Sequence, residues 1–209
     1  MANTKAPYGF RPIRYMSGAA WTGGGRQYYV PASYASNIFI GDPVVITGTG
    51  NASEFMGIGP GGYSTVQLGT AGPSNFWTGI CTGIIPVTRD STIYHQAGVE
   101  GLIVVEDDPN VIFSVQDDGF AALGVGAVGL NANGIAGAGN TASGRSGWAL
   151  DAGTVTAPAS NSLYNLFIIA TSRGIGGSVV VGGDGTSAYA AWEVRLNRTT
   201  YAPAAGTGI

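Results

Sequence analysis

Charged side chains are scarce in this sequence of 209 residues. Lys, Arg, Asp and Glu make up 10% of it, and Lys5 is the single lysine, whereas charged residues make up about 25% of an ordinary globular domain. Long amphipathic helices need a charged face at helical spacing, so the composition argues against them. Nine basic and twelve acidic residues give a net charge of −3. The basic excess of a nucleic-acid-binding protein is therefore missing, and we expect no nucleic-acid partner.

Cysteine and histidine are equally scarce. Cys81 is the single cysteine, which excludes an intrachain disulfide. His95 is the single histidine, which excludes a metal site built from several histidines. A cysteine nucleophile would need His95 as its base, but no flanking motif supports such a pair. We expect Cys81 to be a small buried residue, and we expect no enzymatic activity and no cofactor.

Long apolar runs are absent as well. No stretch reaches the roughly 18 apolar residues that a membrane-spanning helix needs. Residues 1–16 contain two prolines, three basic residues and no apolar core, which is not the pattern of a signal peptide. We expect synthesis in the cytoplasm and no membrane partner.

Glycine, by contrast, is abundant. The chain has 36 glycines, well above the usual share of about 7%, and they follow no period of three, which excludes collagen. At 44% hydrophobic residues the sequence is too apolar for a disordered chain. Short strands separated by glycine-rich turns are typical of an all-β sandwich or barrel. We predict a jelly-roll-like fold of this class with long Gly-rich loops.

Period-two alternation locates the strands. The clearest pattern lies at 190–198, where Trp192, Val194 and Leu196 alternate with polar residues. Two glycines inside 76–88 suggest bulges within that strand. Further strands are predicted at 26–30, 37–40, 44–47, 64–68, 102–106, 111–116, 147–150, 163–171 and 178–181.

Four turn-forming residues, Asp107-Asp108-Pro109-Asn110, separate two of these strands and predict a β-hairpin. Antiparallel pairing in that hairpin would bring Glu100 close to Asp117 and Asp118. The three carboxylates would then form a weak cation site. The alternative is that the aspartates only form turns in solvent.

Two segments, 57–62 and 124–129, match the GxGxxG spacing of dinucleotide-binding loops. That function requires a helix directly after the glycines, with its N-terminus facing the phosphates. A strand pattern follows the first segment, and a glycine- and asparagine-rich stretch follows the second. We therefore predict no nucleotide site.

The first 25 residues differ from the rest and are predicted to form an extended N-terminal arm, with a single β domain over 26–209. Prolines 7 and 12 and glycines 23–25 disfavour regular structure in the arm. Its aromatic residues are too apolar for a solvated tail, so the arm either docks on a neighbouring chain or packs on its own domain. Aromatic and arginine residues are common interface anchors. The predicted partner-binding residues are Tyr8, Phe10, Arg11, Arg14, Tyr15 and Trp21.

Four stretches resemble the head decoration, or cement, proteins of tailed phages. They are residues 2–12 (ANTKAPYGFRP), 109–113 (PNVIF), 139–147 (GNTASGRSG) and 192–197 (WEVRLN). The resemblance implies a β-rich protein on the capsid exterior of the virion, bound to the major capsid protein, with no catalytic residues. The low surface charge favours association of copies, and we expect a trimer rather than a dimer.

Two other classes of function remain open. A tail or baseplate β-module that binds host-surface glycans would expose an aromatic cluster around a groove, and the chain has tryptophans to build one: Trp21, Trp77, Trp148 and Trp192. An enzyme such as a hydrolase would bring several ionisable groups together. The position of these side chains in the fold distinguishes the three classes.

Overall fold

The computed structural model describes residues 3–172 and 187–201. About 39% of the structure is strand and 2% is helix, which confirms the all-β prediction. The strand expected at 178–181 lies outside the described residues. Within the described ranges, no helix is long and apolar enough to cross a membrane.

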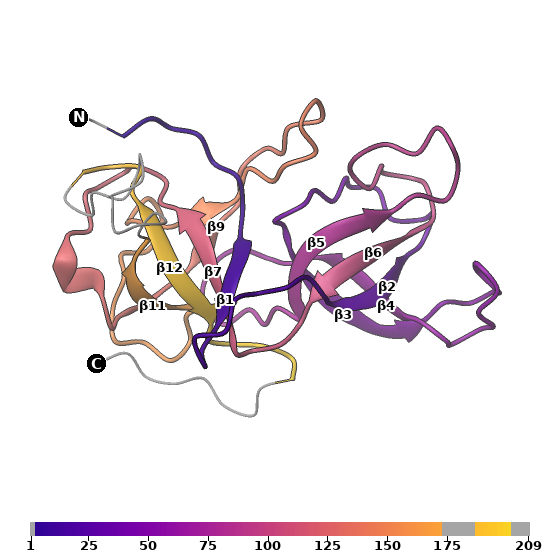
Figure 1. Cartoon of the computed structure of the whole chain (residues 1–209), viewed down its shortest axis with the longest axis horizontal. Helices are drawn as coiled ribbons and strands as arrows, with labels where there is room; N and C mark the ends of the chain where they lie inside the picture. Colours follow the sequence, from indigo (N-terminus) through magenta and orange to yellow (C-terminus); the bar gives the residue numbers. More distant parts are fainter. Residues whose placement is uncertain (1–2, 173–186, 202–209) are drawn as a thin grey trace.

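The strands form two β units that lie side by side (Figure 1). The first is a closed barrel in the order β2-β4-β3-β5-β6, and the second is a five-stranded sheet in the order β1-β7-β12-β11-β8. Five strands make a smaller barrel than the eight of a jelly roll. The barrel strands are β2 (Arg26–Val30), β3 (Pro43–Gly50), β4 (Ser64–Leu68), β5 (Gly79–Ile85) and β6 (Gly101–Glu106).

The second unit consists of β1 (Arg11–Tyr15), β7 (Val111–Gln116), β8 (Asn131–Ala132), β11 (Leu166–Thr171) and β12 (Ala191–Leu196). Two short strands, β9 (Gly134–Ile135) and β10 (Ala149–Leu150), form a separate ribbon beside it. The 3-10 helix Val125–Ala127 lies within the second glycine-rich segment, 124–129. It has a single turn, so it offers no helix of the kind a dinucleotide site requires.

Glycine is required at particular points of the barrel. A Cβ added to Gly79 would lie 2.2 Å from the backbone oxygen of Glu106, so only glycine allows β5 and β6 to approach there. The register between these strands shifts between Cys81 and Gly83. This shift confirms the irregularity predicted from the glycines of this strand.

A shared core joins the two units. The sheet contributes Trp192 and Val194 to it, β5 contributes Ile80, and the segment before β5 contributes Trp77. The backbone of Trp77 also pairs with the chain after β12, since its N–H donates to Arg198 at 3.2 Å. A second cluster, which includes Val30, Val44, Val66, Ile103 and Val105, fills the barrel.

The alternation predicted for β12 is confirmed, because Trp192, Val194 and Leu196 are all buried. Its polar face is covered as well, and Glu193 is only 9% exposed. The strand lies between β7 and β11, so neither of its edges faces solvent.

The predicted hairpin is wrong. β6 pairs with β2 and β5 inside the barrel, whereas β7 pairs with β1 and β12 in the sheet. Residues 107–110 are therefore the connection between the two units. Every residue of β7 is buried, and five of the six in β6 are. Both edges of β6 and both edges of β7 are paired with other strands, so neither has an edge left for a hairpin, and the local turn signal did not reveal this.

The N-terminal arm contains a regular strand, which corrects the prediction of a segment without one. β1 pairs antiparallel with β7, with Pro12 opposite Phe113. Proline is tolerated because β1 is at the edge of the sheet. The chain then turns back, and Tyr15 and Trp21 donate their N–H groups to Ala19 and Ile13. The boundary predicted after residue 25 thus lies between β1, which belongs to the sheet, and β2, the first strand of the barrel.

Candidate functional site

The predicted partner-binding residues lie on the N-terminal segment, and Phe10 fixes that segment to the chain's own core. Its ring is 1% exposed and meets Trp77 edge-on, with 5.6 Å between ring centroids. Its N–H donates to the oxygen of Gly41 at 3.0 Å. Next to it, Gly9 has φ +72°, and an added Cβ would lie 2.4 Å from the Cβ of Ser146. The backbone of Gly9 lies so close to Ser146 and Gly41 that no side chain fits, and its positive φ also favours glycine.

Residues 3–8 continue as an extended segment, held by polar side chains of β7. The amide of Gln116 accepts the N–H of Ala6 at 2.8 Å and donates to the oxygen of Thr4 at 2.9 Å. The hydroxyls of Tyr8 and Ser114 are 2.8 Å apart, and burial raises the pKa of Tyr8. Gln116 was not predicted as important. The signal available was one polar amide at the end of an otherwise apolar strand.

The remaining predicted residues also have partners within the chain. Arg14 pairs with Glu193 at 2.6 Å, and Tyr15 packs against the shared core. Trp21 donates its indole N–H to Glu106. Arg11 alone is exposed, without an ion pair in the described residues. Of the two alternatives for the arm, the structure has it packed on its own domain, and a role in binding another chain stays a prediction.

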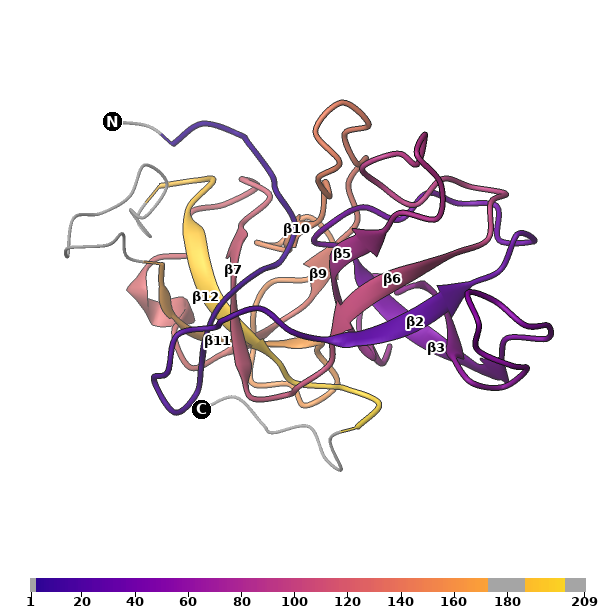
Figure 2. The same cartoon turned by 45° about the vertical axis from the view of Figure 1, so that its right-hand side comes forward.

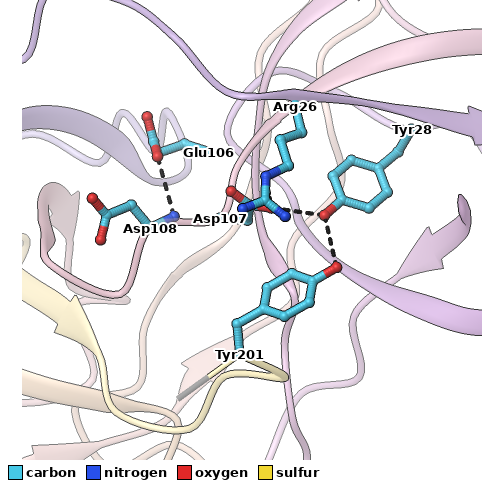
Figure 3. Close-up of polar contacts among 6 residues, drawn as sticks. All are labelled: Arg26, Tyr28, Glu106, Asp107, Asp108 and Tyr201. Atoms are coloured by element: carbon cyan, nitrogen blue, oxygen red, sulfur yellow. Dashed lines mark hydrogen bonds and ion pairs between the residues drawn. The ribbon is translucent and has the colours of Figure 1, made fainter. Parts of the chain in front are cut away.

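A cluster of polar residues lies where the two units meet (Figure 3). Tyr28 donates its hydroxyl to Asp107 Oδ2 at 2.7 Å, and Arg26 Nε lies 3.4 Å from the same oxygen. The hydroxyls of Tyr28 and Tyr201 are 3.1 Å apart, and the Arg26 guanidinium stacks over the Tyr201 ring. Burial, together with these hydrogen bonds and the nearby carboxylate, raises the pKa of Tyr28 well above its usual range. The contacts tie β2, the connection after β6 and the chain after β12 together.

The three carboxylates of the predicted cation site are not brought together. Glu100 accepts a hydrogen bond from the hydroxyl of Tyr29 at 2.8 Å. Asp117 is buried and accepts from the backbone of Gly119, Tyr189 and Ala190 and from the Trp192 indole. Burial raises the pKa of Asp117. Because the hairpin does not form, the pairing that would have placed Glu100 beside it is absent.

Ionisable groups do not converge elsewhere in the described ranges either. No group of three or more His, Cys, Asp or Glu residues there could hold a metal ion. Cys81 is fully buried, and its thiol donates to the oxygen of Gly83 at 3.6 Å. Burial raises the pKa of Cys81 and lowers that of His95. No hydrogen bond joins these two residues among those of the described chain.

Asp42 is a buried acid that the sequence did not single out. It is 3% exposed, and burial raises its pKa from 3.8 to about 6. Its Oδ2 accepts the N–H of Phe39 at 2.8 Å, which closes a turn before β3. The side chain of Ser146 also bonds to it, close to the point where Gly9 passes.

The tryptophans do not form a sugar-binding face. Trp77, Trp148 and Trp192 are buried in the shared core, and Trp21 is half-buried. Two cavities that are open to solvent lie on the part of the chain that the structure describes. The larger, about 440 Å³, lies beside residues 5–7, and the other, about 310 Å³, lies between the barrel and the loop before β6.

Comparisons with protein-family models, with curated proteins and with solved structures give no match.

Proposed function

We propose that this chain is a structural virion protein that binds and stabilises the outer surface of a phage capsid. One relationship carries the proposal: the four stretches that resemble decoration proteins are adjacent in the fold. Residues 2–12 lead into β1, residues 109–113 lead into β7, and residues 192–197 cover most of β12. These three strands are consecutive in the sheet.

The strand registers and the position of the fourth stretch also place these residues next to one another. Phe113 of β7 lies opposite Pro12 on one side and Val194 on the other. Ser146, in the stretch 139–147, lies against Gly9 of the first stretch. Stretches that are far apart in sequence thus form one packed unit. Matching stretches that pack against one another are what a shared framework would produce, and this supports the cement interpretation.

The surface also supports a role in assembly. Several large apolar side chains on the loops of both units are more than half exposed, namely Met56, Phe76, Ile93, Phe120, Val125 and Val155. Exposed apolar side chains on a chain with so few charges favour burial against other proteins. The expected partners are the major capsid protein and further copies of this chain, as a trimer. The glycan-binding alternative has less support, because three of the four tryptophans that could contribute to its aromatic cluster are buried.

The test is a binding assay with empty capsid shells. Purified protein is mixed with shells of the major capsid protein, the shells are sedimented, and bound protein is measured against concentration. We expect saturable binding and a higher melting temperature of the shells. A glycan array run in parallel is expected to give no signal. Absence of co-sedimentation, or binding to glycans alone, would contradict the proposal.

The oligomeric state is measured separately by light scattering after size-exclusion chromatography. We expect the mass of a trimer. A monomer both in solution and on the shell would contradict the proposed self-association but leave the shell-binding result unaffected.

A further inference from the structure

The larger cavity forms a groove between two extended segments of the chain. Residues 5–7 lie along one side and residues 135–138 along the other, and Asp117 and Asp118 contribute to the lining. In Figure 2 the indigo N-terminal chain passes close to β9 and β10. A volume of about 440 Å³ is at the lower end of the roughly 300–1,000 Å³ typical of ligand pockets.

One wall of the groove is bare backbone. Ala136, Gly137 and Ala138 are exposed, and their N–H and C=O groups make no hydrogen bond within the described residues. A Cβ added to Gly137 would lie 2.1 Å from the oxygen of Gly147, so no side chain fits there. Unpaired donors and acceptors in a row are what an added strand binds to.

The groove also contains one carboxylate, Asp118, that no cation of the described residues pairs with. The ion pairs of the described residues are Arg14 with Glu193 and Arg26 with Asp107, so no cation pairs with Asp117 or Asp118. The Oδ2 atom of Asp118 is buried and has no hydrogen-bond partner among the described residues. With no cation beside it in that part of the chain, this carboxylate attracts a basic side chain that enters the groove.

The groove contains one cation as well. Lys5 is at the rim with its side chain exposed to solvent, and it makes no ion pair in the described residues. Asp118 in the lining and Lys5 at the rim therefore predict opposite preferences for the charge of a bound segment. Asp118 is less exposed to solvent than Lys5, so its charge is less screened, which favours a basic occupant.

We propose that this groove receives one extended segment of the shell protein, aligned along 136–138 and bearing a lysine or arginine that pairs with Asp118. The inference rests on the proposed capsid-binding function. The backbone of the segment pairs with the exposed N–H and C=O groups of 136–138, which supplies affinity without regard to sequence. The basic side chain supplies the preference for one segment over another.

The charge of the occupant is tested with two single substitutions. In the wild-type chain, Oδ1 of Asp118 accepts the N–H groups of Phe120 and Ala152, both at 3.1 Å. Asp118→Asn removes the charge but keeps an oxygen that can accept these two bonds. We expect it to weaken shell binding about tenfold, the effect of losing one charge-assisted pair. Lys5→Gln is the matched control, and we expect it to bind at least as tightly as wild type. The reverse pattern, or equal affinity of all three proteins, overturns the proposal.

Hydrogen exchange provides a second test that uses the wild-type protein, so misfolding of a variant cannot affect the result. The amides of 136–138 are expected to exchange fast in the free protein and to become protected on shells. Those of Gly57 and Gly59, on a distant barrel loop, serve as the reference for general slowing. If the protein binds shells but the amides of 136–138 are not protected, the proposed binding of a segment in the groove is wrong, while the proposed capsid-binding function stands. If the wild-type protein does not bind shells, the proposed function and the occupant fail together.

Discussion

Trp21 donates its indole N–H to Glu106 Oε2 at 2.7 Å. Trp21 lies on the connection from the sheet to the barrel, and Glu106 is the last residue before the chain returns to the sheet. The other carboxylate oxygen of Glu106 accepts the N–H of Asp108 at 3.2 Å. One hydrogen bond thus fastens the two connections to each other.

Replacing this donor is expected to weaken the junction. Trp21→Phe keeps an aromatic ring but leaves an oxygen of Glu106, a residue only 4% exposed, without its donor. We expect a loss of about 1–3 kcal/mol in the free energy of unfolding, measured by urea titration. Glu106→Gln in the same assay is the companion variant, because its single oxygen can accept from only one of the two donors, Trp21 and Asp108, and we expect a loss of similar size. Unchanged stability of Trp21→Phe would show that the contact does not hold the junction.

Phe10→Ala is expected to destabilise the whole chain. The ring is in the core shared by both units, and removing a buried phenylalanine costs about 3–5 kcal/mol. Phe120→Ala, at a ring 67% exposed, is the control and should change stability by less than about 0.5 kcal/mol. A soluble Phe10→Ala variant with wild-type stability but weak shell binding would instead mean that Phe10 acts at an interface.

Asp42 makes stability depend on pH in an unusual direction. Its pKa is raised from 3.8 to about 6, so the folded chain binds this proton more tightly than the unfolded chain. Its contribution is fully present below about pH 4 and is lost as the pH rises through 6. We expect Asp42→Asn, which still offers an oxygen to Phe39, to raise stability at pH 7 by up to roughly 3 kcal/mol.

The measurement is urea unfolding of both proteins at pH 4 and pH 7. The gain of Asp42→Asn is expected at pH 7 and should be largely absent at pH 4. An equal effect at both values would mean that Asp42 ionises no differently in the folded and unfolded chains.

Cys81 is expected to be inert in the native protein. Burial raises the pKa of its thiol, and the nearby Asp42 carboxylate adds to the shift, so the reactive thiolate is strongly disfavoured. Iodoacetamide at neutral pH should leave the folded protein unmodified by mass spectrometry and label it fully in urea. Rapid labelling of the native chain would indicate that the barrel opens at β5.

The sequence patterns located several strands, because runs of β-branched and aromatic residues are bounded by turn-forming residues. The predicted boundaries at 26–30, 64–68 and 111–116 are those of β2, β4 and β7. Pairing was harder to predict, because turn residues look alike whether they close a hairpin or connect two units. The shared core also has no local signal, since Phe10, Trp77 and Trp192 come from distant parts of the chain.

The candidate groove could not be predicted from the sequence either, because it depends on contacts between distant segments. Its wall at Gly137 and Gly147 depends on a close approach between two glycines that composition alone does not reveal. The unpaired state of Asp118 depends on a sheet arrangement that the hairpin prediction got wrong. The acidic pair itself was visible in the sequence, but its surroundings were not.

The order of strands in the sheet has a consequence for biosynthesis. The barrel uses one continuous stretch of chain, from β2 to β6, and can close as soon as that stretch has left the ribosome. β1 is synthesised before the barrel, but its partner β7 is synthesised after it. β7 in turn has a second partner, β12, which is synthesised later still. Pairings between such distant segments form slowly. The nascent chain therefore holds a finished barrel flanked by an unpaired first strand, and chaperone contact is expected at residues 11–15.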